Sequence, residues 1–413
     1  MQTPVGNTDP VARAVLALTG NELFHAGWEL PEQTDWAAVF DECGRQTVTV
    51  HGWKQAKIAG ILPESVAHAW EEAAVGAAVH SLQVTWEHND LDARMRQAGI
   101  PYVVLKGSAS ARYYPEPLDR QMGDVDFLVK REDMERAGRL LEEAGFQPWE
   151  EKHICHVVYR KGPAHLEMHF EPAGVPHGEA GELVRGWMAD AMDCARTIPC
   201  EQGYLSVPSD FHHGLVLLLH TSHHLLGEGI GLRHLCDWAV FSASLSSDRF
   251  REVFEKKLKR IGLWKFACIL TWTSARWLGS PLPEWAGRPE PRMADALIED
   301  IFKGGNFGRK QEGKVYESYL ISSRGKDGVG RISMPRQFLR SLNEMVCTHW
   351  PAAGRIPLLL PAGWLFFCGR YLLRMAAGKR PPVRTGSLIQ NAVQRKNLYT
   401  QFRLFESEER ISK

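Results

Sequence analysis

Residues 105–129, LKGSASARYYPEPLDRQMGDVDFLV, decide how the middle of this chain folds. The apolar run that ends at Leu105 and the run of residues 124–129 are short and rich in valine, which predicts two β-strands. Gly107 and Ser108 directly follow the first strand, and small side chains after them predict the start of a helix. The stretch therefore predicts a strand, a glycine turn, a helix and a second strand.

The residues that follow extend this pattern. Residues 132–144 form an apolar face at helical spacing and end before Gly145, which predicts an amphipathic helix. Residues 156–159 and 165–170 predict two paired strands joined by a turn. We therefore expect an α+β core with a small mixed sheet and flanking helices at residues 101–207. Mostly helical regions are expected on either side of it, at residues 1–100 and 208–413.

Composition excludes several classes of protein. The chain has 413 residues, enough for two or three domains of roughly 100–200 residues each. Its formal net charge is zero, which argues against a dedicated polyanion-coating protein, and its eight cysteines are dispersed, as expected for reduced thiols. The first twenty residues do not resemble a signal peptide, so we expect a cytoplasmic protein. Residues 356–373 are apolar but contain two prolines and Arg370, and we do not expect them to span a membrane.

Three carboxylates carry the predicted chemistry. Residues two apart on a strand point to one face, about 6 to 7 Å apart, so Asp124 and Asp126 should project together while Val125 faces the core. Glu167 lies on a later apolar strand, where a charge is costly unless a metal or a partner compensates it. Mg²⁺ favours such carboxylates together with phosphate oxygens. A magnesium and nucleotide site is therefore expected at Asp124, Asp126 and Glu167.

A second group of residues suggests a place for phosphates. Gly107 allows a close approach of the backbone, and Ser108 opens the expected helix, whose N–H groups attract anions. Lys106 and Arg120 flank this turn and could neutralise phosphate charge. Alternatively, both cations are ordinary surface charges.

Taken together, these motifs resemble the DNA polymerase beta-like nucleotidyltransferase superfamily. Its pattern is an apolar residue, Gly followed by Gly or Ser, a spacer, Asp-apolar-Asp and a later acidic strand residue. The full string 105–129, the pair Gly145-Phe146 and the strand HLEMHF at 165–170 resemble a bacterial branch of uncharacterised nucleotidyltransferases. GLRHLCDWAVF at 231–241 resembles the helical continuation of that branch. The third acid is Glu167 in place of Asp.

The resemblance implies transfer of a nucleoside monophosphate from an NTP to an acceptor, with release of pyrophosphate. Two Mg²⁺ ions would be bound by Asp124 and Asp126, with Glu167 on the acceptor side as ligand and general base. Gly107 and Ser108 would hold the β- and γ-phosphates, and Lys106 and Arg120 would stabilise the charge that develops. The acceptor is expected to be a small molecule, a glycan intermediate or a peptide.

Two alternatives remain open. The chain could act on a macromolecule such as tRNA or a protein, as a toxin-like nucleotidyltransferase. It could also bind a nucleotide as a regulatory module without catalysis, although three inward carboxylates argue against this.

Residues 345–405 contain no acidic side chain but nine Lys and Arg residues. This basic, partly apolar region could bind an anionic acceptor, RNA or a membrane surface, or it could be packed helices with solvated arginines.

Histidines and one charge pair complete the set of candidates. His220, His223 and His224 have helical spacing that could suit zinc, but no further ligand pair accompanies them, so packing is favoured. His169 shares a strand face with Glu167 and could orient that carboxylate. Arg233 and Asp237, four residues apart on a predicted helix, are expected to form an intrahelical ion pair.

Overall fold

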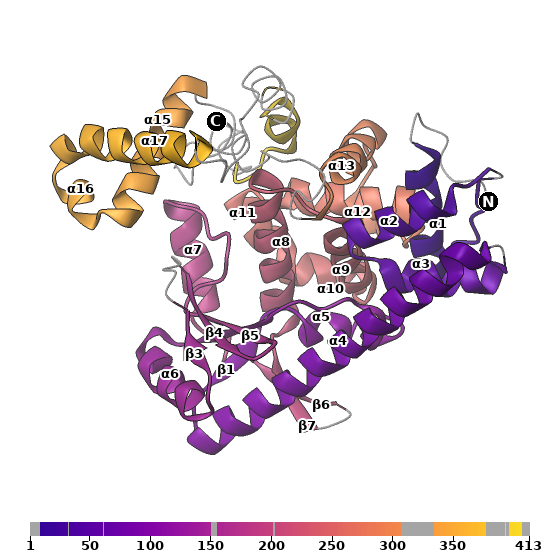
Figure 1. Cartoon of the computed structure of the whole chain (residues 1–413), viewed down its shortest axis with the longest axis horizontal. Helices are drawn as coiled ribbons and strands as arrows, with labels where there is room; N and C mark the ends of the chain where they lie inside the picture. The colour runs from indigo at the N-terminus through magenta and orange to yellow at the C-terminus, as the bar shows by residue number, and fades with distance from the viewer. Residues whose placement is uncertain are drawn as a thin grey trace.

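The computed structural model describes residues 9–31, 33–60, 62–149, 155–200, 203–306, 334–376, 393 and 396–406 (Figure 1). Its core is a five-stranded mixed sheet between helices, the α+β class that the sequence predicts. The strands follow the order β1-β2-β5-β4-β3, and a separate pair is formed by β6 and β7. Their bounds are β1 Tyr102–Val104, β2 Val125–Val129, β3 Gln147–Pro148, β4 His156–Lys161, β5 Ala164–His169, β6 Arg196–Cys200 and β7 Gly203–Val207.

The centre of the sheet is a parallel pair, β2 and β5, in which Asp126 is the register partner of Glu167. β1 runs antiparallel to β2, and β4 runs antiparallel to β5, so the predicted hairpin of β4 and β5 is present. β3 and the β6–β7 hairpin were not predicted.

The two faces of β2 meet different cores, as its alternating side chains require. Val125 and Phe127 pack into a cluster with apolar residues of α4 (Glu64–Ala98) and α6 (Met134–Glu143). Leu128 points the other way, into a larger cluster formed mainly by helices. In Figure 1, α4 passes along one side of the sheet and α8 (Asp210–Leu226) rises from the opposite side. Asp126 is thus directed between the sheet and the helical body.

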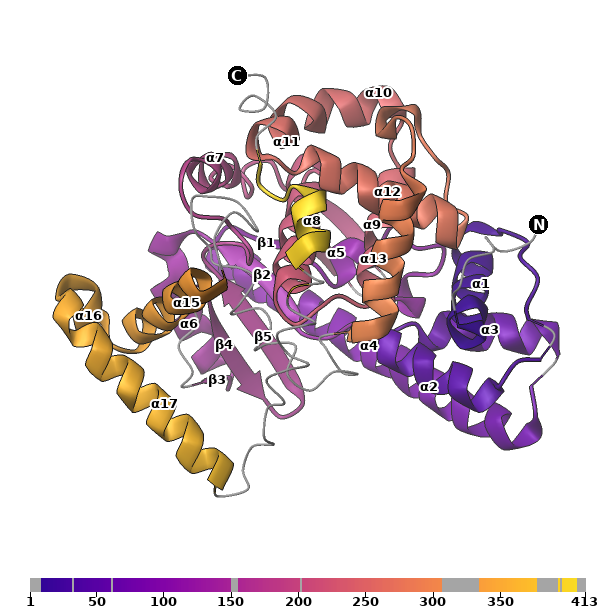
Figure 2. The same cartoon turned by 90° about the horizontal axis from the view of Figure 1, so that it is seen from above.

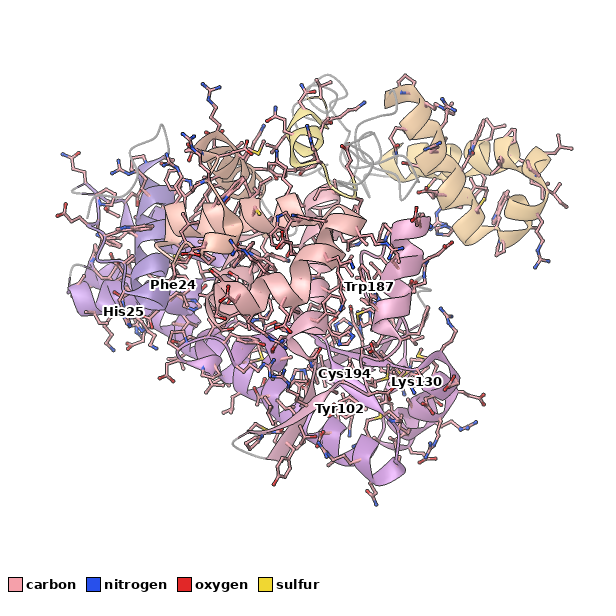
Figure 3. All side chains as sticks on the ribbon, turned by 180° about the vertical axis from the view of Figure 1, so that it is seen from behind. Phe24, His25, Tyr102, Lys130, Trp187 and Cys194 are labelled. Carbon is pink, nitrogen blue, oxygen red and sulfur yellow. The ribbon has the colours of Figure 1, made fainter. Side chains whose placement is uncertain are left out.

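Strand β1 is tied to α4 by a polar contact. The Tyr102 hydroxyl donates a hydrogen bond to the Asp92 carboxylate, and both side chains are buried. Figure 3 labels Tyr102 where β1 meets this helix. Helix α4 ends at Ala98, and Gly99 follows it with a left-handed φ of 61°.

Most remaining helices pack around one apolar core. Figure 2 shows these helices from above. These are α1 Pro10–Phe24, α2 Trp36–Gln46, α3 Thr49–Ala59, α7 Glu179–Met188, α9 Leu232–Ala243, α10 Ser247–Phe250, α11 Lys256–Ile261, α12 Trp264–Leu278 and α13 Pro291–Gly304. The short helix α5 (Ser108–Ala111) packs instead into the cluster beside α4 and α6.

The helical pattern of residues 250–278 is not one helix. A π-helical turn spans Arg251–Glu255, and α11 ends at Gly262, whose φ of 72° reverses the backbone before α12. The backbone of Glu406 packs against Gly262 and leaves no space for a side chain at this position.

Helices α15 (Met334–His349), α16 (Pro351–Arg355) and α17 (Leu360–Ala376) form a group at one end of the molecule (Figures 1 and 2). Several of their apolar side chains are exposed, among them Leu358, Leu365 and Leu373. Within the described residues, no helix has both the length and the apolar character needed to cross a bilayer. Lys379, Arg380, Arg384 and Arg395 of the basic region lie outside the described residues.

Candidate functional site

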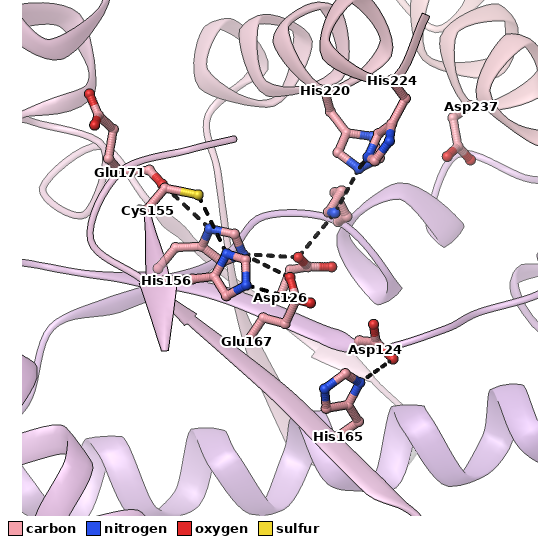
Figure 4. A network of polar contacts seen from close by, with 12 residues as sticks. Asp124, Asp126, Cys155, His156, His165, Glu167, Glu171, His220, His224 and Asp237 are labelled. Atoms are coloured by element: carbon pink, nitrogen blue, oxygen red, sulfur yellow. Dashed lines mark hydrogen bonds and ion pairs between the residues drawn. The ribbon is translucent and has the colours of Figure 1, made fainter. Parts of the chain in front are cut away.

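Five polar side chains of β2 and β5 gather on the sheet face that looks toward α8 (Figure 4). Asp124 directly precedes β2, and Asp126 is its second residue. His165, Glu167 and His169 alternate along β5. Because β2 and β5 are adjacent and in parallel register, the two alternating sets meet. We refer to these five residues as the DxD/HxExH cluster.

One half of this cluster surrounds Asp126. The Nε2 atom of His169 lies 3.1 Å from Asp126 Oδ1 and 3.4 Å from Glu167 Oε2. The Lys106 ammonium lies 3.0 Å from the same Asp126 oxygen. The Asp126 and His169 side chains are 8% and 2% exposed, so these charges interact away from bulk water.

The other half surrounds Asp124. Its Oδ1 lies 2.7 Å from Nδ1 of His165, and the two side chains are 44% and 26% exposed. Asp124, His165 and Glu167 offer ligand atoms within 4.8 Å of one another, as do Asp126, Glu167 and His169. Glu167 therefore belongs to both halves, and the structure brings all three predicted carboxylates together.

The protonation of the cluster follows from these contacts. Burial raises the pKa of Asp126, but the Lys106 charge and the His169 hydrogen bond outweigh burial and hold that pKa well below its usual range. Burial lowers the pKa of His169, whereas its hydrogen bonds, first to Asp126, raise the pKa well above the ordinary value. The hydrogen bond to Asp124 likewise raises the pKa of His165. The cluster is thus a set of carboxylates compensated by nearby cations.

Gly107 forms the predicted turn after β1. Its φ of 57° is in the left-handed region, and an added Cβ would lie 2.8 Å from Cε1 of His88. Within the described part of the chain, the backbone N–H groups of Gly107 and Ser108 donate no hydrogen bond. The Ser108 hydroxyl is engaged by His88 Nδ1 at 2.9 Å. What this turn can offer an anion is therefore its backbone N–H groups.

Arg120 lies apart from the cluster and is held in a buried ion pair. Its guanidinium donates two hydrogen bonds to Asp237 of α9, at 2.7 and 2.8 Å, and the Tyr114 hydroxyl donates a third. Burial raises the pKa of Asp237, but Arg120 outweighs burial and lowers it to about 2. The expected ion pair of Arg233 with Asp237 was wrong, since Arg233 donates to the backbone carbonyl of Gln121.

Histidines of α8 and α9 form the opposite wall of the site. Lys106 Nζ lies 2.9 Å from His220 Nε2, which lies 3.1 Å from His224 Nε2, and the His234 ring stacks on that of His220. Burial lowers the pKa of His234 to about 3 and that of His220 well below its ordinary value. These histidines are neutral and pack around the lysine. Their contact with Lys106 could not be anticipated from spacing.

The donor atoms of the cluster suit a divalent cation. Carboxylate oxygens are the ligands that Mg²⁺ prefers, and imidazole nitrogen is a ligand for transition metals. His169 and His165 compensate the carboxylates in the structure, and a cation placed among the same oxygens would compensate them equally. Cys155, His156 and His169 form a further group of neighbouring donor atoms beside the cluster.

A small mixed sheet that carries converging carboxylates beside a glycine turn is the arrangement that the sequence predicts for a nucleotidyltransferase. The comparison with protein families agrees: a model of an uncharacterised nucleotidyltransferase family matches residues 32–279, and the chain belongs to this family. The match includes all of the sheet, the cluster, the glycine turn and helices α8, α9 and α12. Neither the comparison with curated proteins nor that with solved structures gave a match.

Proposed function

We propose that this nucleotidyltransferase moves a nucleoside monophosphate from an NTP to an acceptor hydroxyl or phosphate, in a reaction that depends on Mg²⁺. The acceptor oxygen forms a bond to the α-phosphorus, the bond between that phosphorus and its bridging oxygen breaks, and pyrophosphate leaves. The acceptor is a small molecule, a glycan intermediate or a peptide. The observation that carries this proposal is the register of β2 and β5, which sets Asp126 opposite Glu167.

Each residue of the site has a role in this scheme. Asp124 and Asp126 would hold two divalent ions, and Glu167 would complete the ligand set on the acceptor side. Bound there, the ions supply Lewis-acid stabilisation of phosphoryl charge. The Glu167 side chain is 21% exposed, so an acceptor can reach its carboxylate, which would take the acceptor proton.

The phosphates of the NTP would lie at the glycine turn. Gly107 and Ser108 offer backbone N–H groups to the β- and γ-phosphates. Lys106 lies beside Asp126 and can turn its ammonium toward a phosphate once cations compensate the carboxylates. Arg120 was predicted to contact phosphate as well. Because its guanidinium is bound to Asp237, we assign it instead the role of fixing the loop before β2 against α9.

The test is transfer by the full chain with each NTP, Mg²⁺ and cell extract, with pyrophosphate and labelled product measured. Asp126→Asn should reduce transfer at least about a hundredfold, since charge stabilisation at the reacting phosphate is lost. The control is Glu135→Gln, an 83% exposed carboxylate on α6, which should leave the rate unchanged. Equal rates for wild type and Asp126→Asn would overturn the proposal.

Binding provides an independent measurement. A Mg-NTP at a hundred times its dissociation constant should raise the free energy of unfolding by about 2.7 kcal/mol. Absence of stabilisation by every Mg-NTP would contradict nucleotide binding at this site.

A macromolecular acceptor is the second candidate, and the exposed apolar and basic side chains of α15–α17 favour it. Arg355 and Arg370 are exposed on the same group of helices as Leu358 and Leu365. An RNA acceptor would bind with an affinity that falls steeply with salt, because counterions are released from its phosphates. A membrane surface would be recognised by binding to anionic vesicles.

A further inference from the structure

We propose that the DxD/HxExH cluster is a mixed oxygen and nitrogen centre, in which His165 and His169 are metal ligands and which binds Mn²⁺ in preference to Mg²⁺. This inference rests on the proposed function, since it concerns the cations of the same site. It assigns to two histidines a role that the acidic motif alone does not supply.

The placement of the donors supports two neighbouring cation positions. Asp124, His165 and Glu167 form one set, and Asp126, Glu167 and His169 form the other, each with ligand atoms within 4.8 Å of one another. Each set consists of two carboxylates and one imidazole, and Glu167 is common to both. The strand period of two places His165, Glu167 and His169 on one face of β5, which brings both imidazoles beside the carboxylates.

The orientation of His169 is that of a metal ligand. Its Nε2 atom points between Asp126 and Glu167, while its Nδ1 atom lies 3.4 Å from the backbone carbonyl oxygen of Glu171. A carbonyl oxygen only accepts, so Nδ1 is the donor in that contact and Nε2 faces the carboxylates. Ligating histidines characteristically donate their second nitrogen to a carbonyl or carboxylate in this way.

Ligand chemistry then selects among cations. Mg²⁺ demands nearly ideal octahedral oxygen coordination and keeps several waters. First-row transition metal ions accept imidazole more readily than Mg²⁺ does, and Mn²⁺ shares the octahedral geometry of Mg²⁺, so the comparison that decides here is Mn²⁺ against Mg²⁺. A centre with one imidazole in each set therefore favours Mn²⁺.

A purely structural role for the histidines makes a different prediction. If they served only to compensate the carboxylates, a bound cation would displace both imidazoles and would be coordinated by oxygen alone. The two cases differ in whether nitrogen lies in the coordination shell, which spectroscopy of the bound ion detects directly.

The experiment uses the full chain with Mn²⁺ alone. Pulsed electron paramagnetic resonance of the wild type should show nitrogen coupling from directly bound imidazole. Calorimetry should give an affinity for Mn²⁺ at least about tenfold above that for Mg²⁺. Wild-type protein that binds Mn²⁺ without nitrogen coupling, or binds both ions equally, would overturn the inference.

Variants identify the ligands. His169→Gln and His165→Gln should each reduce the nitrogen coupling and lower Mn²⁺ affinity about tenfold or more, with a smaller effect on Mg²⁺. The control is His68→Gln, a 79% exposed histidine of α4, which should change neither quantity. Absence of nitrogen coupling in the Mn²⁺-loaded wild type, together with intact Mg²⁺-dependent transfer, would defeat this inference but leave the proposed function standing. The transfer rate of Asp126→Asn tests only the proposed function and does not bear on the choice between Mn²⁺ and Mg²⁺.

Discussion

Histidines lie on both sides of Lys106, and the two groups differ in charge. On β5, carboxylates raise the pKa of His165 and His169. On α8 and α9, burial lowers the pKa of His220 and His234, and nearby cations lower it further. The difference shows that the neighbouring strand β2, with its two aspartates, determines which histidines can hold a proton. The sheet side is a polar centre suited to a cation, and the helical side is a neutral wall that confines it.

The largest effect is expected in acid, where buried neutral histidines of the helices must take up protons. Burial lowers the pKa of His51 and His88 to about 4, and that of His213 and His234 to about 3. In the unfolded chain these groups bind a proton near pH 6.5. The contribution of these histidines to the free energy of unfolding is therefore complete above about pH 6.5. It is lost as the pH falls toward the pKa values that they have in the folded protein. By linkage each contributes a loss of about 2 to 3 kcal/mol at pH 4.5.

Together these losses approach the whole stability of a typical domain, about 5 to 15 kcal/mol. We therefore expect acid unfolding between about pH 6 and 4.5, measured by urea denaturation across this range. His213 packs against Tyr113 and Phe241 without a hydrogen-bond partner for either ring nitrogen among the described residues. His213→Phe should reduce the slope of the free energy of unfolding against pH by the equivalent of one proton. An unchanged slope in this variant would show that His213 does not contribute to acid unfolding.

The next largest effect concerns the buried ion pair of Arg120 and Asp237, which joins the loop before β2 to helix α9. Arg120→Met leaves Asp237 buried without its cation and should lower the free energy of unfolding by about 3 to 5 kcal/mol. Urea denaturation followed by tryptophan fluorescence measures the change. Arg45→Met removes an exposed ion pair with Asp41 and should cost under about 1 kcal/mol.

A double variant separates charge from packing. Arg120→Met combined with Asp237→Leu should recover part of the lost stability, because an apolar pair can replace a buried ion pair. If Arg120→Met cost no more than Arg45→Met, the pair would not join the sheet to the helical body.

The smallest effect lies at the glycine turn. Gly107→Ala places a methyl group against His88 and forces a left-handed φ on alanine, which should lower the free energy of unfolding by about 1 to 2 kcal/mol. Gly76 lies inside α4 with open space around it, so Gly76→Ala should raise stability by about 0.5 to 1 kcal/mol. Thermal denaturation of both variants measures the difference, and equal effects would show that the turn has no special geometry.

Much of the fold could be predicted because its signals are local. Alternating or valine-rich runs identified β1, β2, β4 and β5, and the helical period identified α6. The end of α11 could not be predicted, since a glycine within a helical pattern is ambiguous until the distant Glu406 is known to pack against it. The β6–β7 hairpin was also missed.

The site was partly predictable for the same reason. Because residues two apart on a strand point to the same face, Asp124 could be placed beside Asp126. The resemblance identified Glu167 as the third carboxylate. His165 was overlooked, although its alternation with Glu167 and His169 was a usable signal. The partner of Arg120 had no local signal, because Asp237 lies 117 residues away and Arg233 stands nearer to it in sequence.

The division of β2 between two cores has a consequence for isolating parts of this enzyme. Leu128 completes the apolar interior that α8 and α9 build, and Arg120 requires Asp237 from α9. A fragment cut at residue 207 would expose an uncovered sheet surface and an orphaned guanidinium. We expect such a fragment to aggregate, and we expect the smallest autonomously folding piece to extend at least through α13, whose apolar residues belong to the same core as α12.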